Sequence, residues 1–257
     1  MGRVLSVVNQ KGGVGKTTTA LNLAAAAADM GVRTLLIDLD AQGNATSGLG
    51  IDRSSLERCV HDVIVPQGSD GLSIAEVVVS CAVEGLDVVP ATIDLAAADM
   101  ELAPQMARET RLRSALSDVA DGYGLVLIDT GPSLGILTVN SLVAADAVII
   151  PIQCEYYALE GLSQLLRVIS LVQENLNPNL RIGGVVLTMY DGRTSLTREV
   201  AAEVRRHFPG LVFGSAIPRN IRLAEAPGFG LPGVRYDPSS SGARAYRQLC
   251  REVLANA

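Results

Sequence analysis

A glycine-rich segment between an apolar run and a helical pattern constrains this chain more than any other feature. Residues 8–19 read VNQKGGVGKTTT. The run before it, Val4–Val8, is apolar like a buried strand, and Thr17–Met30 has a helical composition. Glycines at such a turn let successive backbone N–H groups converge, and the start of the helix adds its positive dipole end. The order strand, glycine turn, helix therefore predicts an α/β architecture with an anion-binding turn.

Strand-like and helical runs alternate along the whole chain, which predicts one α/β domain over residues 1–257. Its sheet is expected to be doubly wound and mostly parallel, with helices on both faces, because most apolar runs lack polar alternation. The segment Val65–Glu84 is expected to be loop with a short helix. The expected strands are Val4–Val8, Thr34–Leu39, Leu86–Val89, Leu125–Asp129, Ala147–Ile152, Ile182–Thr188 and Val212–Ile217. The expected helices are Thr17–Met30, Asp94–Leu102, Arg108–Val119, Leu134–Ala144, Leu159–Asn175, Ser195–His207 and Ser241–Asn256.

The glycine turn has the residue types of a phosphate-binding loop. Lys16 would reach the β- and γ-phosphates, and the Thr17 hydroxyl would ligate Mg²⁺. The full pattern G-x-x-x-x-G-K-[ST] is not met, because Gln10 stands where its first glycine should be. A glycine-rich turn that binds no nucleotide is the alternative. The matching strand, helix and GKT sequence favour the phosphate-binding interpretation.

Lysine usage singles out two positions in this loop. Lys11 and Lys16 are the only lysines in the chain, and every other basic position except the histidines is arginine. A lysine ammonium is a compact charge that fits inside a backbone cradle, whereas the guanidinium of arginine is wider and demands a planar partner. Phosphate binding thus accounts for Lys16 but leaves Lys11 without a role.

Three aspartates lie at the ends of two predicted strands. Asp129 closes the run GLVLID, and Asp38 and Asp40 close TLLIDLD on one face, because residues i and i+2 of a strand point the same way. Any one of them could be a helix cap or a solvated loop residue. Three carboxylates beside a phosphate loop at the carboxyl edge of a sheet favour magnesium and nucleotide chemistry.

Five motifs carry a resemblance to a family. In order, KGGVGKTT, LLIDLDAQGNATSGLG, LVLIDTGPSLG, VLTMYDGRT and IPRNIRLAEAPGFG resemble the ParA/Soj chromosome-partitioning ATPases, within the group with a deviant Walker A loop. The likeness covers nearly the whole chain. It implies an ATP-sandwich dimer in which Lys11 reaches the phosphates of the other subunit. The residue similar to Asp40 positions the attacking water, and Lys16 completes the catalytic set.

The resemblance also implies the ligand contacts. Thr17 and Asp129 would hold Mg²⁺, with Asp38 supporting the metal from behind, and Pro218 and Asn220 would flank adenine. ATP is favoured over GTP, because Thr188-Met189-Tyr190-Asp191 lacks the lysine that stacks on guanine in GTPases of this architecture. The nucleotide-binding segment would comprise Lys11, Gly12, Gly13, Val14, Gly15, Lys16, Thr17 and Thr18.

Charge is distributed unevenly, which bears on DNA binding. The chain carries a net charge of −6, yet residues 181–257 hold eleven arginines against six acidic residues. In the family, arginines at Arg193, Arg219 and Arg222 contact the DNA backbone, so non-specific double-stranded DNA is the expected partner. The alternative is that these arginines simply pair with carboxylates such as Asp191 and Glu225.

The function that the resemblance implies is a Mg-dependent ATPase acting in chromosome or plasmid segregation. ATP hydrolysis would be slow alone and stimulated by a ParB-like partner, and the protein would be cytoplasmic and nucleoid-associated, with no secretion signal, membrane span or membrane partner expected. One alternative is a MinD-like membrane ATPase, for which the apolar stripe of Ser241–Asn256 would have to detach as a membrane helix. Another is an electron-transfer ATPase like the nitrogenase iron protein, for which Cys154 is the candidate ligand. Relatives usually read CPPS or APP after the strand that ends at Asp129, so Gly131 departs from the family pattern.

Overall fold

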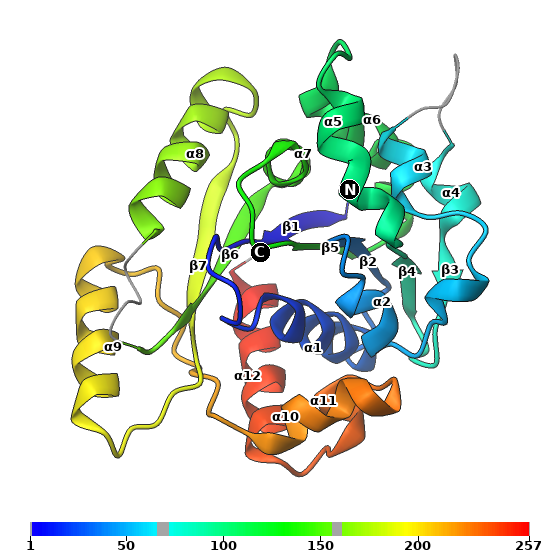
Figure 1. Ribbon diagram of the computed structural model, residues 1–257. Helices are drawn as coiled ribbons and strands as arrows, with labels where there is room; N and C mark the ends of the chain where they lie inside the picture. The colour runs from blue at the N-terminus through cyan, green and yellow to red at the C-terminus, as the bar shows by residue number, and fades with distance from the viewer. Residues whose placement is uncertain (1, 66–71, 156–160, 257) are drawn as a thin grey trace.

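A computed structural model describes residues 2–65, 72–155 and 161–256 (Figure 1). Its centre is a seven-stranded sheet in the order β3-β4-β2-β5-β1-β6-β7, in which only the short pair β3–β4 is antiparallel. This confirms the predicted doubly wound, mostly parallel α/β fold. The strands are β1 (Arg3–Val7), β2 (Thr34–Leu39), β3 (Val79–Ser80), β4 (Leu86–Val89), β5 (Leu125–Thr130), β6 (Ala147–Gln153) and β7 (Arg181–Thr188).

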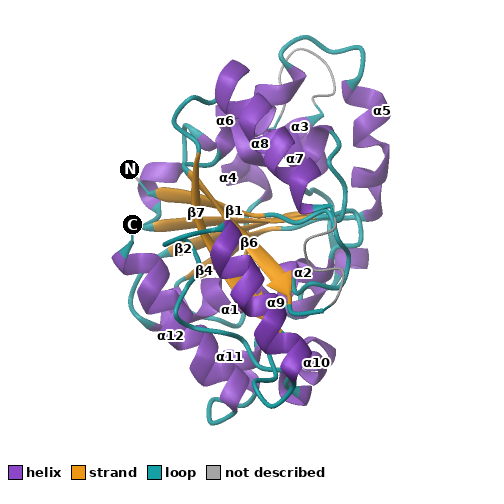
Figure 2. Cartoon of the chain, turned by 90° about the vertical axis from the view of Figure 1, so that its left-hand side faces the viewer, coloured by secondary structure: helices purple, strands orange, loops and turns teal. Residues whose placement is uncertain are grey.

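Helices cover both faces of the sheet, as the edge-on view shows (Figure 2). Helices α1, α11 and α12 lie on one face, and α5 to α8 lie on the other. The short helix expected between Val65 and Glu84 is α4. The helices are α1 (Lys16–Asp29), α2 (Asn44–Gly48), α3 (Val60–Ile64), α4 (Ile74–Val77), α5 (Ala98–Leu102), α6 (Arg111–Leu116), α7 (Ile136–Ala144), α8 (Leu162–Asn175), α9 (Ser195–His207), α10 (Ile221–Glu225), α11 (Gly233–Tyr236) and α12 (Ser241–Ala255).

Alternation along the strands divides the interior into two apolar cores. In β2, Leu35 and Ile37 pack into the core under α5 to α8, while Leu36 packs into the core under α1 and α12. The alanines of α1, Ala24 to Ala27, are fully buried there. Small side chains let the helix lie close to the sheet, and alanine loses no side-chain entropy on burial. Both cores support the carboxyl edge of the sheet, where β1 meets the glycine loop.

Two sequence-based expectations about strands need correction. Val212–Ile217 is not a strand: it meets β7 through an isolated bridge between Val185 and Val212 and a hydrogen bond from the Ile217 N–H to the Leu187 carbonyl at 2.8 Å. The pairing breaks at Gly214 and Ser215, whose N–H groups turn away and donate to the Glu252 carboxylate at 2.7 and 3.0 Å. The two-residue strand β3 was also not expected, because so short an antiparallel pair leaves no periodicity in the sequence.

Predicted helix boundaries also shift at several ends. The expected helix Asp94–Leu102 starts as a 3-10 turn over Ile93–Ala97 before α5, and Arg108–Val119 contains only α6 as α-helix. The first two residues of the expected helix Leu159–Asn175 lie outside the described residues, and α8 begins at Leu162. The other long helices agree with expectation to within two residues.

Candidate functional site

The glycine-rich loop joins β1 to α1 and is fixed to the sheet by side chains of two polar residues. Asn9 Nδ2 donates to the Pro151 carbonyl of β6 at 2.7 Å, and Asn9 Oδ1 accepts the Lys11 N–H at 3.0 Å. Thr188, at the end of β7, donates its hydroxyl to the Val14 carbonyl at 2.8 Å. The bonds to Pro151 and Val14 are buried, so water does not compete with them and the loop is held in one conformation.

Glycine is required in this loop by the backbone at two positions. Gly13 and Gly15 have φ values of +75° and +87°, a region that residues with a β-carbon rarely adopt. Gly12 and Gly13 are exposed, so their backbones are open to a ligand, whereas the Val14 side chain is buried in the core. Val14 therefore offers a ligand only its main chain.

Lys16 is buried at the first position of α1, with 6% of its surface exposed. Its Nζ donates to the Lys11 carbonyl at 3.1 Å. Burial lowers the pKa of Lys16, while the negative charges of Asp129 and Asp40 oppose that shift. A bound phosphate would stabilise the charged form of Lys16, which burial disfavours. It could replace the Lys11 carbonyl, the neutral acceptor of the Lys16 ammonium.

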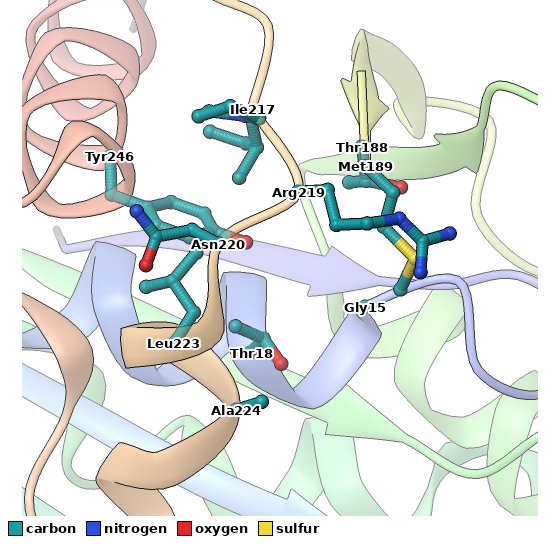
Figure 3. A pocket seen from close by; sticks show the side chains of 11 residues that line it. Gly15, Thr18, Thr188, Met189, Ile217, Arg219, Asn220, Leu223, Ala224 and Tyr246 are labelled. Atoms are coloured by element: carbon teal, nitrogen blue, oxygen red, sulfur yellow. The ribbon is translucent and has the colours of Figure 1, made fainter. Parts of the chain in front are cut away.

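Two adjoining cavities follow the loop. The first, of about 330 Å³, is lined by the glycine loop, the first turn of α1 and the ends of β2 and β5: Gly12, Gly13, Gly15, Lys16, Thr17, Thr18, Asp40, Gln42, Asn44, Pro132 and Met189. The second, of about 200 Å³, shares Gly15, Thr18 and Met189 with it and is otherwise mostly apolar, with Ile217, Pro218, Leu223 and Tyr246 in its wall (Figure 3). A polar cradle continuous with an apolar slot matches the shape of a nucleotide.

Pro218 and Asn220 both lie in the wall of the apolar cavity. Asn220 is already engaged: its Oδ1 accepts the Arg222 N–H at 2.8 Å as the cap of α10, and its Nδ2 donates to Ser241 Oγ at 2.9 Å. The amide is therefore held in one orientation, and its oxygen keeps a second lone pair for a ligand.

Asp38 and Asp129 are paired across β2 and β5 and lie buried beneath the polar cavity rather than in its wall. Asp38 Oδ2 accepts the Thr46 N–H and hydroxyl at 2.8 and 2.7 Å. Burial raises the pKa of Asp38 to about 6, against these hydrogen bonds. Both oxygens of Asp129 are buried without a hydrogen bond of good geometry, and the Thr17 side chain is near enough to lower the pKa of Asp129 somewhat. Burial raises the pKa of Asp129 well above its ordinary value, and the neighbouring Asp38 charge adds to the rise.

A divalent cation would compensate the buried negative charge of Asp129. A buried carboxylate without a partner costs free energy unless it is neutralised or paired with a cation. Magnesium usually takes one or two protein oxygens and completes its shell with phosphate oxygens and water. The described residues contain no group of three or more His, Cys, Asp or Glu side chains that could hold a metal by themselves. The residues present therefore fit a magnesium ion shared with a phosphate ligand, which Thr17 and Asp129 could hold.

Lys11 differs from Lys16 in both exposure and partner. Its side chain is 36% exposed, and its Nζ lies 4.0 Å from Glu155 Oε2. Glu155 is also within 3.6 Å of the Arg219 guanidinium. An ion pair this long and exposed contributes little free energy, so the Lys11 ammonium is available to another partner.

The three arginines proposed for DNA all pair with carboxylates inside the chain. Arg193 forms a two-bond pair with Asp191 at 2.9 and 2.7 Å, and this pair lowers the pKa of Asp191 to about 2. Arg222 lies 2.9 Å from Glu225. The side chains of Arg193 and Arg219 are 91% and 72% exposed. The alternative raised from the sequence, pairing with Asp191 and Glu225, is thus what the structure contains, and the DNA contacts stay a prediction.

Comparisons with known proteins agree with this geometry. A family model described as an AAA domain matches residues 2–182. The sporulation initiation inhibitor protein Soj of Bacillus subtilis is 53% identical over 256 residues, covering 100% of both chains. The chromosome partitioning protein ParA of Caulobacter vibrioides is 51% identical over 255 residues, covering 98% of this chain and 94% of its own. The chain belongs to the ParA/Soj family of chromosome-partitioning ATPases.

A solved structure resembles this ParA/Soj chain along nearly its whole length. It is reported as cobyrinic acid a,c-diamide synthase from Mycobacterium smegmatis with bound ADP and magnesium. It is 40% identical to this chain, covers 98% of this chain and 93% of its own, and has a TM-score of 0.85. The fold of this ParA/Soj chain is therefore one that holds a magnesium nucleotide in a solved relative.

Sequence reasoning missed several residues of this ParA/Soj site. Asn9 and Thr188 fix the loop, Thr46 satisfies Asp38, and Met189 lines both cavities. All four lay in segments already singled out, but the positive φ of Met189, +50°, shows only in the structure. The others act through hydrogen bonds that the sequence does not reveal.

Proposed function

We propose that this chain is a magnesium-dependent ATPase whose ATP-bound dimer binds DNA non-specifically during chromosome or plasmid segregation. Hydrolysis is slow alone and is stimulated by a ParB-like partner, which releases the dimer from DNA. The protein acts in the cytoplasm on the nucleoid. The observation that carries the proposal is the pair of joined cavities beside the buried carboxylate of Asp129.

Each residue of the site has a part in nucleotide binding. The N–H groups from Gly12 to Thr17, together with the Lys16 ammonium, hold the phosphates, and Thr18 lies where the polar and apolar cavities meet. Pro218 and Asn220 border the space for adenine. Thr17 and Asp129 would hold the magnesium ion, which when bound neutralises phosphate charge and orients the γ-phosphate. Asp38 lies next to Asp129 on the paired strand β2 and would support the metal from behind.

Asp40 and Lys11 would make the site catalytic. Asp40 lies in the wall of the polar cavity, where its carboxylate can orient a water molecule and take up its proton. Lys11 is exposed at the mouth of the loop and would reach the phosphates of a second subunit, adding positive charge where it develops during transfer. This dependence on a second subunit links hydrolysis to dimer formation.

The arginines support non-specific DNA binding despite their ion pairs. Arg193, Arg219 and Arg222 pair at the surface, where solvent screens such pairs and they add little to stability. A DNA phosphate can therefore replace the carboxylates at small cost. Each phosphate neutralised would steepen the salt dependence by about 0.9 log units in affinity per log unit of salt.

Neither alternative activity is favoured by the site. The apolar stripe of α12, with Tyr246, Leu249, Cys250 and Val253, is buried in the core beside α1, so a membrane helix would have to unpack it. None of the described helices is long and apolar enough to cross a membrane. Cys154 is buried, and burial raises its pKa to about 11, so it favours the neutral thiol over a cluster ligand.

The test uses Asp40→Ala, with Asp118→Ala as an exposed control far from the cavities. Light scattering with ATP or ADP would report the oligomeric state, and retention of an unrelated DNA fragment at two salt concentrations would report DNA binding. We expect Asp40→Ala to form a dimer with ATP alone and to hold DNA in a salt-sensitive way. A variant that turns over ATP at the wild-type rate would contradict the role of Asp40. A dimer that ignores DNA would contradict the segregation function.

A further inference from the structure

Gly131 lies directly against the carboxylate of Asp40. The two residues follow the paired ends of β2 and β5, where Leu39 is opposite Thr130, so they leave the sheet side by side. A β-carbon built on Gly131 would lie 3.3 Å from Asp40 Cγ and Oδ1 and 3.5 Å from Oδ2. Because all three carboxylate atoms are at nearly the same distance, the carboxylate faces the place that a β-carbon of Gly131 would occupy.

Backbone conformation does not explain glycine at this position. The φ of Gly131 is outside the left-handed region, unlike those of Gly13 and Gly15, so alanine could adopt the same conformation. A side chain at this position would instead fill the space between Gly131 and the Asp40 carboxylate. A β-carbon at 3.3 Å is closer than ordinary van der Waals contact, so the carboxylate would have to move by a few tenths of an ångström.

Few other contacts fix the Asp40 carboxylate. Its Oδ1 accepts the Gln42 N–H at 3.0 Å, a bond within its own exposed turn. Its backbone is anchored more firmly, because the Asp40 N–H reaches Asp38 Oδ1 at 3.3 Å and the Asp40 carbonyl accepts the Gly43 N–H at 2.8 Å. The surface of Gly131 is therefore a main determinant of how deep the carboxylate sits in the polar cavity.

We propose that Gly131 is a positioning residue for ATP hydrolysis: by lacking a side chain it sets the place of the Asp40 carboxylate at the γ-phosphate. This inference rests on the proposed function, in which Asp40 orients the attacking water. Because a displacement of 1 Å in a reacting group can cost about 100-fold in rate, a shift of a few tenths should slow hydrolysis roughly threefold to tenfold. Nucleotide affinity should not change, because Gly131 does not line either cavity.

The experiment compares Gly131→Ala with Gly122→Ala in the full chain. Gly122 precedes the same strand at its other end, has no atom within 4 Å of its would-be β-carbon and also lies outside the left-handed region, so it controls for the glycine-to-alanine change. Single-turnover hydrolysis at saturating Mg-ATP measures the catalytic step, titration with a fluorescent ATP analogue measures affinity, and thermal unfolding checks the fold. Crystal structures of the wild type and Gly131→Ala locate the Asp40 carboxylate.

The expected result is a threefold to tenfold slower catalytic step in Gly131→Ala, with unchanged affinity, a displaced Asp40 carboxylate and a Gly122→Ala variant that matches the wild type. A Gly131→Ala variant with the wild-type hydrolysis rate would overturn the inference, as would an Asp40 carboxylate that has not moved. A wild-type protein that does not hydrolyse ATP would instead overturn the proposed function, so the two failures are distinguishable.

Discussion

Replacing Asp129 by asparagine should stabilise the nucleotide-free protein. The neighbouring Asp38 is subject to the same burial: its pKa rises from 3.8 to about 6, and at about 1.4 kcal/mol per pKa unit this corresponds to about 3 kcal/mol for Asp38 itself. A raised pKa in the folded state means that this stability is present below the unfolded value and is lost as the pH rises through about 6. The pKa of Asp129 is raised by the same causes, burial first and the Asp38 charge second. Its ionised form therefore destabilises the fold at neutral pH.

The Asp129→Asn variant removes that charge and keeps the shape. Without nucleotide, in a metal chelator at pH 8, we expect it to be more stable than the wild type by about 1–3 kcal/mol, the usual cost of a buried polar group without a partner. For a chain of 257 residues each kcal/mol raises Tm by about 2–4 °C. The difference should shrink as the pH falls to 4.5, because protonation of the buried wild-type carboxyl relieves the same penalty.

Thermal unfolding by circular dichroism at both pH values measures this difference, with Asp118→Asn as an exposed control. Adding Mg-ATP should reverse the order, because a ligand at 100 times its Kd stabilises the wild type by about 2.7 kcal/mol and the variant has lost a metal-holding group. The reasoning is refuted if Asp129→Asn is less stable than the wild type at pH 8 in chelator. It is refuted equally if its advantage is the same at pH 4.5.

Three further predictions concern the loop, the dimer and DNA. Thr188→Val leaves the Val14 carbonyl buried without a donor and should lower the free energy of unfolding by about 1–3 kcal/mol in urea titrations while weakening ATP binding; unchanged values for both would show that Thr188 does not hold the loop. Lys11→Arg should bind ATP but fail to dimerise in light scattering, because a planar fork does not fit a backbone cradle, and a normal dimer would rule out the proposed contact. Arg193→Gln should reduce the slope of log affinity for DNA against log salt by about 0.9 relative to the wild type, and Arg113→Gln on α6 should not.

The sheet could be predicted because parallel strands buried on both faces leave continuous apolar runs, and these runs are visible in Thr34–Leu39 and Leu125–Thr130. Val212–Ile217 is also mostly apolar, but Glu252, 37 residues or more along the chain, accepts the N–H groups of Gly214 and Ser215 in place of a strand partner. The composition of a segment indicates whether it can form a strand. It does not reveal a hydrogen-bond acceptor on a distant helix that competes with the strand partner.

The site likewise contains residues that could be predicted from the sequence and residues that could not. The glycines, Lys16 and Thr17 could be found because they are contiguous, and their spacing carries the chemistry. Asn9 and Thr188 act on residues 142 and 174 positions away in the chain, so nothing near them in the sequence marks their role. The pair of Arg193 with Asp191, two residues apart, could be proposed as an alternative from the sequence, whereas the shared contact of Glu155 with Lys11 and Arg219 could not.

The loop backbone is held firmly and its two lysine ammonium groups are held weakly. This difference explains how the site can be ordered before a ligand binds. The backbone is fixed by buried hydrogen bonds to Asn9 and Thr188, so ordering it adds little to the cost of binding. The charges are held weakly: Lys16 has one carbonyl, and Lys11 has a pair at 4.0 Å that water screens. A triphosphate that binds therefore gives both lysines stronger partners than the Lys11 carbonyl and Glu155, and little of the chain has to move. The same reasoning gives the two lysines separate tasks, because the buried one can serve only its own loop and the exposed one can serve a neighbour.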